Sequence, residues 1–324
     1  MNSQSHPIIL GGSLTTHGFN PLQQAMFMVK GSNAGAGVAN MEGKVVLITG
    51  ATRGIGRKVV HGMAPSGATM IVVGRDQSRI DEVISEAKAI DGCGPISGEV
   101  CNLLEQDEIR ALAERVKSQH SQLDVLVNNA GAIFTKNIKT PAGFERTWAL
   151  NHNAYFLLTS LLKDQLMSSP AARVISTASE AHRPGKMRWD DLQYDKRGSM
   201  GGWSTYCQSK LANILFTKEL ARKLSGTDVT ANCIHPGFVN TGFSRNNGLI
   251  GRLVMFLTWP VQRRDSKGAE TIVWLATSEA ARKHNGEYLY NCKPGKLSKA
   301  AKRDEDAAKL WGLSEQMTST SDLW

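Results

Sequence analysis

Residues 45–56 read Val45-Val-Leu-Ile-Thr49-Gly50-Ala-Thr-Arg53-Gly54-Ile-Gly56, an apolar run followed by a glycine-rich turn. The run is too short for a helix and rich in β-branched residues, which predicts a buried strand. A helix that begins in the turn would direct backbone N–H groups at a diphosphate. Gly50 permits the tight turn, Gly54 lets the backbone approach a ligand, and Gly56 allows close packing of helix on strand. Although the spacing G-x-x-x-G-x-G differs from the G-x-G-x-x-G fingerprint, its place between strand and helix predicts a cofactor cradle.

Short apolar runs recur from Gly43 onward and alternate with longer amphipathic stretches, such as 107–120 and 144–167. The alternation predicts an α/β fold, a single doubly wound Rossmann-type domain whose parallel sheet is flanked by helices. The expected strands are 45–49, 69–73, 123–127, 173–177 and 229–233.

The same change of pattern suggests the domain organisation. Residues 1–40 are rich in Gly, Ser, Asn and Gln without helical or strand periodicity, so we expect an N-terminal extension. Residues 41–295 form the predicted Rossmann domain. Residues 296–324 form a basic C-terminal tail, expected to be a solvated surface segment with a short helix around Asp304 to Leu313.

Composition narrows the class of protein. The 324 residues are 41% apolar and 21% charged, which is ordinary for a soluble globular chain. The net charge of +9 comes mostly from scattered residues, which argues against a nucleic-acid partner. No stretch has the apolar length of a membrane span. Five widely spaced cysteines and eight histidines form no metal motif, and we expect a cytoplasmic protein.

Tyr206 and Lys210 are four residues apart, in Tyr206-Cys-Gln-Ser-Lys210. On a helix this spacing places both side chains on one face, where the ammonium favours the ionised phenol. Bringing a tyrosine pKa from ~10 to neutrality requires roughly 4 kcal/mol. One positive charge about 4 Å away supplies approximately that much at an effective dielectric near 20. Taken alone, the spacing equally fits an ordinary helix with an exposed lysine and a half-buried tyrosine.

Arg75 occupies the position, about 20 residues after the glycine turn, where an acidic residue contacts the adenosine ribose in NAD-binding folds. An arginine there can pair with a 2′-phosphate, and Arg53 can close on the same group. We therefore expect NADP(H) as the cofactor. In the alternative, Arg75 points into solvent and Asp76 contacts the ribose.

Together these features resemble the short-chain dehydrogenase/reductase family, over roughly residues 43–291. Within it, residues 206–221, Ala181-His182 and Leu310-Trp311 are similar to the retinol dehydrogenase-like branch. In family order, the matching motifs are the glycine turn, Asn128-Asn-Ala-Gly131, Asn151 in Leu-Asn-His, Ser179, Tyr206 with Lys210, and Pro236-Gly237.

The resemblance implies an NADP(H)-dependent oxidoreductase that interconverts an alcohol and an aldehyde or ketone on a small, largely apolar substrate. Tyr206 would exchange the proton of the substrate oxygen, Lys210 would tune the tyrosine and hold the nicotinamide ribose, Ser179 would donate to the carbonyl oxygen, and Asn151 would support a water beside Lys210. The implied cofactor-binding residues are Gly50, Thr52, Arg53, Gly54, Ile55, Gly56, Arg75, Asn102, Leu103, Asn129, Ala130, Gly131, Tyr206, Lys210, Pro236, Gly237, Val239 and Thr241.

Several positions depart from the family pattern. Asn102 stands where an aspartate usually contacts adenine, and Asn153-Ala-Tyr155 replaces the usual Leu-Gly-His. The loop 180–203 carries charged residues and is expected to shape the mouth of the substrate site, and an apolar stretch, 243–257, is expected to cover it. We interpret His182 and His235 as structural.

Two other functions compete with this hypothesis. The chain could be a cofactor-binding regulatory or scaffold protein without turnover, or an NADPH-dependent reductase of a carbon–carbon double bond, as in the related protochlorophyllide reductases. Intact Asn151, Ser179, Tyr206 and Lys210 argue against lost turnover. By family analogy we also expect a homodimer, formed through the helices that carry residues 155–167 and 206–224.

Overall fold

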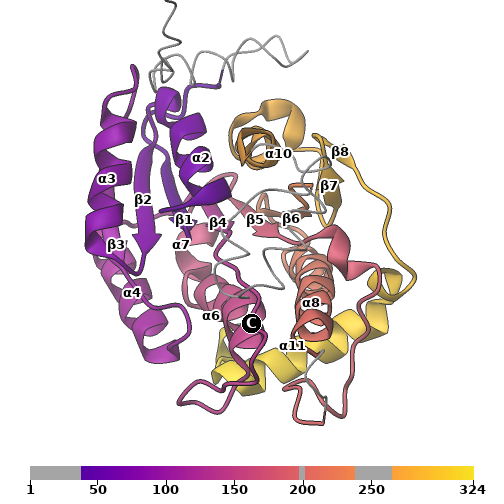
Figure 1. Cartoon of the computed structure of the whole chain (residues 1–324). Coiled ribbons are helices and arrows are strands. Elements are labelled where there is room, and N and C mark those ends of the chain that lie inside the picture. The colour runs from indigo at the N-terminus through magenta and orange to yellow at the C-terminus, as the bar shows by residue number, and fades with distance from the viewer. Residues whose placement is uncertain (1–37, 197–200, 238–264) are drawn as a thin grey trace, which may run out of the picture.

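The computed structural model describes residues 38–196, 201–237 and 265–324 (Figure 1). The N-terminal extension up to residue 37, Val239, Thr241 and the apolar stretch 243–257 lie outside the described residues. The strands are β1 Val45–Thr49, β2 Thr69–Gly74, β3 Ile96–Val100, β4 Val125–Asn128, β5 Arg173–Thr177, β6 Thr230–Ile234, β7 Tyr288–Tyr290 and β8 Lys293–Pro294. The main helices are α2 Gly54–Met63, α3 Gln77–Lys88, α4 Gln106–Gln119, α5 Arg146–Trp148, α6 Ala154–Leu161, α7 Lys163–Met167, α8 Gly201–Lys223, α10 Asp265–Thr277 and α11 Asp304–Thr318.

The strands form one sheet in the order β3-β2-β1-β4-β5-β6-β7-β8. Neighbouring strands pair in parallel from β3 to β7, and only β8 pairs antiparallel, with β7. The chain runs from β1 outward to β3 and then returns to β4 on the other side of β1. This reversal creates a crevice at the carboxyl ends of β1 and β4, where dinucleotide folds bind their ligand. The predicted doubly wound fold is confirmed.

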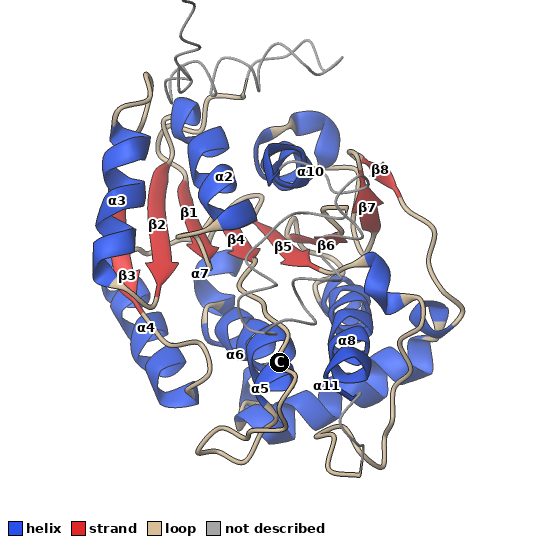
Figure 2. Cartoon of the chain, viewed as in Figure 1, coloured by secondary structure: helices blue, strands red, loops and turns tan. Residues whose placement is uncertain are grey.

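Two helical layers cover the sheet (Figure 2). On one face, α2, α3 and α10 bury a cluster that includes Val59, Ile80 and Ile272. On the other face, α4, α6 and α8 bury a second cluster around Phe156 and Phe216. Both clusters contain strand residues, because the central strands are apolar on both sides, as parallel strands covered by helices are expected to be.

The C-terminal segment differs from the expected solvated tail. Helix α11 continues to Thr318 and packs along α8, and its Trp311 is only 3% exposed. The Trp311 ring lies 4.8 Å from the ring of Phe156 and 5.9 Å from that of Phe216, centre to centre. The basic residues before α11 do face solvent, but the apolar face of the helix completes the core. The apolar face of α11 was not predicted because the many charged residues of this segment favoured a solvated tail.

The packing of α11 also bears on the expected homodimer. The aromatic residues Phe156 and Phe216 lie on α6 and α8, the helices through which we expected dimerisation, and α11 of the same chain covers them. A dimer through these residues would require α11 to move. The homodimer remains a prediction that this packing does not favour.

We expect Trp311→Ala to lower the free energy of unfolding by about 3–5 kcal/mol, because it removes a large buried ring from an aromatic cluster. Urea denaturation followed by circular dichroism measures the change. Lys309→Ala, an exposed position on the same helix, is the control and should change stability by less than about 1 kcal/mol. Equal stabilities for the wild type and Trp311→Ala would show that α11 is not part of the folded core.

Among the described residues, no helix is both long and apolar enough to cross a membrane. All five cysteines are free thiols.

Candidate active site

The glycine turn after β1 has the geometry that its sequence predicted. Gly50 and Gly54 adopt φ angles of +62° and +50°, in the left-handed region that favours glycine. A Cβ atom on Gly56 would lie 2.2 Å from the carbonyl oxygen of Gly50 and 2.6 Å from Nδ2 of Asn129. Helix α2 begins at Gly54, its N-cap residue Arg53 makes no capping hydrogen bond through its side chain, and its first turn contains no acidic residue. The N-terminus of α2 therefore suits an anion.

Thr49 and Asn129 lock this turn to the neighbouring strand. The hydroxyl of Thr49 donates to the carbonyl of Val127 and accepts from the backbone N–H groups of Asn129 and Ala130, at 3.1, 2.9 and 3.2 Å. In return, Nδ2 of Asn129 donates to the carbonyl oxygens of Thr49 and Gly50. Asn129 thus lies at the predicted site, whereas the role of Thr49 was missed. Its only signal was its place at the end of β1.

The end of β2 lies against the glycine turn. A Cβ on Gly74 would approach Cγ2 of Thr52 to 2.6 Å, which places the following residue, Arg75, at the same edge of the sheet. Both Arg53 and Arg75 are exposed. The carboxylate of Asp76 accepts the backbone N–H of Arg79 at 3.2 Å and so caps α3. The alternative expectation was that Asp76 contacts the adenosine ribose. In the structure the carboxylate of Asp76 is already used as the N-cap of α3.

Asn102 and Leu103 follow β3 at the next position along this edge. The side-chain oxygen of Asn102 accepts the N–H of Leu104 at 3.4 Å, and its backbone N–H donates to Glu108 at 2.6 Å. Leu103 is 6% exposed and belongs to the core. The side chain of Asn102 is partly exposed, whereas that of Leu103 is buried.

Lys210 is buried behind the carboxyl end of β5. Its ammonium donates to the carbonyl of Thr177 at 2.8 Å, and Nδ2 of Asn213 donates to the same oxygen at 3.1 Å. A Cβ on Gly131 would lie 3.4 Å from Nζ of Lys210, so glycine at 131 keeps the approach to the ammonium open. Burial lowers the pKa of Lys210 from 10.5 to about 7.

Tyr206 and Ser179 meet at the mouth of the crevice. Burial raises the pKa of Tyr206 from 10.0 to about 12, while a hydrogen bond from the side chain of Ser179 opposes this shift. Ser179 also accepts the N–H of Ala181 at 3.2 Å, which fixes its hydroxyl. The neighbouring Ser176 and Thr177 are both buried, whereas Ser179 is partly exposed. Of these three hydroxyls, that of Ser179 is the one beside Tyr206.

The expected effect of Lys210 on Tyr206 is corrected by this geometry. The ammonium lies 5.7 Å from the centre of the Tyr206 ring and is bound to the carbonyl of Thr177, so burial outweighs its attraction for a phenolate. The pKa of Tyr206 rises where we expected it to fall. The phenol therefore holds its proton at neutral pH.

Asn151 lies in a π-helical turn, Ala149–Asn153, that precedes α6. Its side-chain oxygen accepts the N–H of Ala132 at 2.9 Å, and its Nδ2 donates to the carbonyl of Ala132 and the hydroxyl of Ser209, each at 3.0 Å. Such π-turns are often found at functional sites. Asn151 thus ties α8, which carries Tyr206 and Lys210, to the loop after β4.

The residues that replace the usual Leu-Gly-His lie directly after this turn. Tyr155 is 1% exposed, and the centre of its ring lies 6.0 Å from Nζ of Lys210. Both polar side-chain atoms of Asn153 are buried without a hydrogen-bond partner among the described residues. Tyr155 thus packs beside Lys210, and Asn151 keeps its hydrogen bonds to Ala132 and Ser209.

The two histidines near the site have structural contacts. His182 is bound through Nδ1 to the carbonyl of Ser179 at 2.8 Å and through Nε2 to the N–H of Ser298 at 3.3 Å. His235 stacks on Tyr290 with 4.1 Å between ring centres, and its Nδ1 accepts the N–H of Gly237. Gly237, at the end of the described segment, has a φ of +82°.

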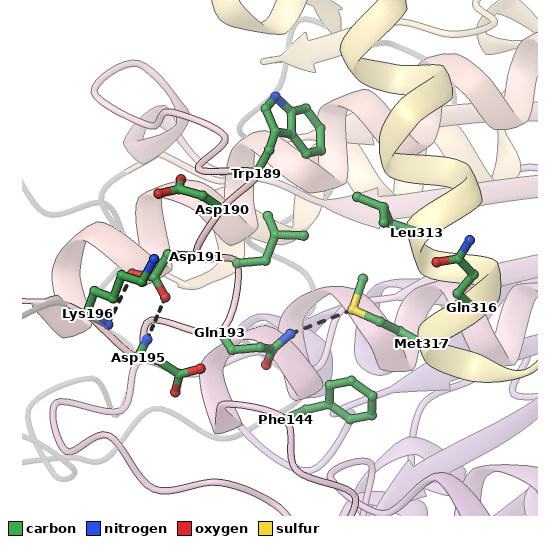
Figure 3. A pocket seen from close by; sticks show the side chains of 11 residues that line it. Phe144, Trp189, Asp190, Asp191, Gln193, Asp195, Lys196, Leu313, Gln316 and Met317 are labelled. Atoms are coloured by element: carbon green, nitrogen blue, oxygen red, sulfur yellow. Dashed lines mark hydrogen bonds between the residues drawn. The ribbon is translucent and has the colours of Figure 1, made fainter.

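Two of the charged residues expected at the substrate mouth, Asp191 and Arg183, contact the protein itself, whereas Lys186, Arg188 and Asp190 are exposed. Asp191 is buried and its carboxylate accepts the N–H of Asp195 at 2.6 Å, while Arg183 pairs with Glu180 and donates to the carbonyl of Lys296. A cavity of about 370 Å³ lies between residues 189–196 and α11, as Figure 3 shows. None of the predicted catalytic or cofactor-binding residues that the structure describes lines this cavity, although it is lined by residues of the loop expected at the substrate mouth, such as Asp190 and Asp191. No cluster of His, Cys, Asp or Glu suited to a metal occurs in the described segments.

The described residues fit a dinucleotide. Arg75 follows β2, the glycine turn and the N-terminus of α2 follow β1, and Lys210 contacts the end of β5, so these groups lie at the same edge of the sheet in the strand order β2, β1, β4, β5. Fold and site together define a dinucleotide-dependent oxidoreductase of the Rossmann type.

Comparison with known proteins names the class. Residues 44–249 match the family model described as short chain dehydrogenase, and the chain belongs to this family. It is 39% identical to bovine retinol dehydrogenase 12 over 272 residues, which cover 84% of this chain and 85% of that protein. It is 36% identical to human retinol dehydrogenase 14 over 293 residues, which cover 86% and 87% respectively. The chain is thus a short-chain oxidoreductase similar to retinol dehydrogenases.

Solved structures show the same fold. A protein from Mycobacterium paratuberculosis superposes with a TM-score of 0.70 at 30% identity, covering 87% of this chain and 96% of the other. A short-chain dehydrogenase from Burkholderia cenocepacia, solved in complex with NADP, superposes with a TM-score of 0.60 at 25% identity, covering 77% and 96%.

Proposed function

We propose that this protein is an NADP(H)-dependent carbonyl reductase of the retinol dehydrogenase-like type, acting on small, largely apolar aldehydes or ketones. The observation that carries the proposal is the convergence of Ser179, Tyr206 and Lys210 beside the glycine turn at the carboxyl ends of β1, β4 and β5. The similarity to retinol dehydrogenases supports the substrate class.

The residues divide the work as follows. The bound nicotinamide cofactor supplies the hydride. The Tyr206 hydroxyl, whose pKa is raised to about 12 by burial, is protonated at neutral pH and donates its proton to the substrate oxygen. Ser179 donates to the same oxygen where negative charge develops. Lys210, which is bound to the carbonyl of Thr177 on β5, would hold the nicotinamide ribose. Asn151 fixes α8 relative to the loop after β4.

The preference for NADP rests on Arg75 and Arg53. Both are exposed at the edge next to the N-terminus of α2, and Asp76, the acidic alternative, is engaged as the cap of α3. A guanidinium can bind a 2′-phosphate through two hydrogen bonds. The NADP complex of the Burkholderia cenocepacia relative agrees with this choice.

The function is tested with a panel of aldehydes and ketones, by following NADPH oxidation and identifying the product. We expect one alcohol formed for each NADPH consumed. Tight NADPH binding without consumption would indicate a cofactor-binding protein, and a saturated carbonyl product from an unsaturated substrate would indicate a reductase of carbon–carbon double bonds. Either result contradicts the proposal.

The cofactor preference gives a separate prediction. Arg75→Ala should lower kcat/KM for NADPH by about 10–100-fold, the loss of a charge-assisted phosphate contact, and change that for NADH by less than about 3-fold. Arg115→Ala removes the same charge from an arginine that pairs with Glu99 at 2.6 Å, and it serves as the control. Equal losses with both cofactors would show that Arg75 does not read the 2′-phosphate.

A further inference from the structure

Trp203 is the most exposed large hydrophobic residue in the described part of the chain, with 51% of its surface accessible. It lies on α8, three residues before Tyr206, so the two side chains share a face of the helix. A single exposed hydrophobic residue is common on protein surfaces and needs no special explanation. Trp203 differs from such residues because it lies beside Tyr206, the proposed proton donor.

The indole of Trp203 stacks on the phenol of Tyr206. The ring centres are 5.8 Å apart and the planes meet at 29°, within the range of favourable offset stacking. One face of the indole is thus directed along the catalytic ring, while the side chain remains half exposed. The indole is therefore an exposed aromatic surface next to the ring of the proposed proton donor.

The two residues before Trp203, Gly201 and Gly202, are closely packed against other segments of the chain. A Cβ on Gly201 would lie 0.5 Å from the hydroxyl of Tyr194, and one on Gly202 would lie 2.7 Å from the carbonyl oxygen of Phe134 and 2.8 Å from Cα of Thr135. The first turn of α8 is therefore packed without spare room against two other segments. The backbone that carries Trp203 is therefore closely packed, and a residue that determines specificity needs such a rigid backbone.

We propose that Trp203 is a specificity-determining residue that forms one wall of the substrate site and favours flat aromatic or conjugated carbonyl compounds over saturated ones of the same size. This inference rests on the proposed carbonyl reductase function. A flat π-system can stack on the indole while its carbonyl reaches Tyr206, and it gains more from that contact than a puckered saturated ring that buries a similar area.

The test uses two aldehydes with the same carbon skeleton, naphthalene-2-carbaldehyde and decahydronaphthalene-2-carbaldehyde. Trp203→Ala should lower kcat/KM about 10-fold for the flat aldehyde, mainly through KM, and less than about 3-fold for the saturated one. Trp203→Phe, which keeps an aromatic face, should retain most of the preference. Met167→Ala removes another exposed hydrophobic side chain, 42% accessible and on α7, and is the control.

The outcomes separate this inference from the function on which it rests. An active Trp203→Ala enzyme with unchanged preference between the aldehydes would overturn the role of Trp203 alone. An equal fall in kcat for both aldehydes would also overturn it, because it would show that the indole only positions Tyr206. If the wild type reduced neither these aldehydes nor any of the carbonyl panel, the proposed function would fail and the inference with it.

Discussion

Replacement of Tyr206 by phenylalanine should lower kcat for carbonyl reduction by about 10²–10⁴-fold, the usual contribution of a positioned general acid. The substitution removes only the hydroxyl that carries the proton and is bound to Ser179, and it keeps the ring that stacks on Trp203. The fold and the affinity for NADPH should therefore change little. Steady-state kinetics, with NADPH binding measured by fluorescence, separates the two effects.

Tyr290→Phe is the matched control for this substitution. It removes a phenol hydroxyl from β7, and its ring, stacked 4.1 Å from that of His235, is kept. Its kcat should remain within about 3-fold of the wild type, because the partly buried Tyr290 takes no part in the proposed proton transfer. If Tyr206→Phe were as active as Tyr290→Phe, another group would have to deliver the proton.

Lys210→Met should make the protein more stable and much less active. The substitution removes a buried ammonium whose pKa is lowered from 10.5 to about 7, which corresponds to at most about 5 kcal/mol of unfavourable burial at low pH. The carbonyl of Thr177 keeps a partner in Asn213. We expect a loss in kcat/KM of about 10²-fold or more, because the ribose contact and the positive charge near the phenol both disappear.

The stability gain should depend on pH with a definite sign. Between pH 7 and 10.5 the unfolded chain binds a proton at Lys210 that the folded chain does not, so the wild type becomes more stable as pH rises through this window. The advantage of Lys210→Met should therefore be largest at or below pH 7 and shrink toward pH 10. Urea denaturation at several pH values measures it.

Lys218→Met is the control, because Lys218 lies on the same helix but pairs with the exposed Asp304 at 2.6 Å. Its effect on the free energy of unfolding should stay below about 1 kcal/mol at every pH. A destabilised Lys210→Met protein would contradict the unfavourable burial of the ammonium.

The central strands and the glycine turn could be predicted from sequence because their signals are local. A run such as 45–49 is β-branched at four of its five positions, and Gly50 and Gly54 occur where a left-handed backbone is required. Strands β3, β7 and β8 were not among the expected strands. Strand β3 contains Gly98 and Glu99 in its five residues, and β7 and β8 contain only three and two residues, so none carries a pattern that could be recognised.

Features that depend on contacts between distant segments could not be predicted. The spacing of Tyr206 and Lys210 showed that they share a helix face, but the direction of the Tyr206 pKa depends on burial and on the carbonyl of Thr177, 33 residues away from Lys210. Likewise, the stretch around Asp304 is visibly helical, but its role in covering Phe216 requires the assembled fold. Local sequence patterns locate helices and strands. The pKa of Tyr206 and the packing of α11 depend on how those helices and strands are assembled.

The proposed reaction is tested most directly by tracing the hydride. NADPH that carries deuterium at both positions of nicotinamide C4 is incubated with the wild-type protein and naphthalene-2-carbaldehyde, and the product is analysed by mass spectrometry and nuclear magnetic resonance. We predict an alcohol with one deuterium on the former carbonyl carbon for each NADPH oxidised. Recovery of the unreacted aldehyde, or consumption of NADPH without deuterium at that carbon, would contradict the assignment of this protein as a carbonyl reductase.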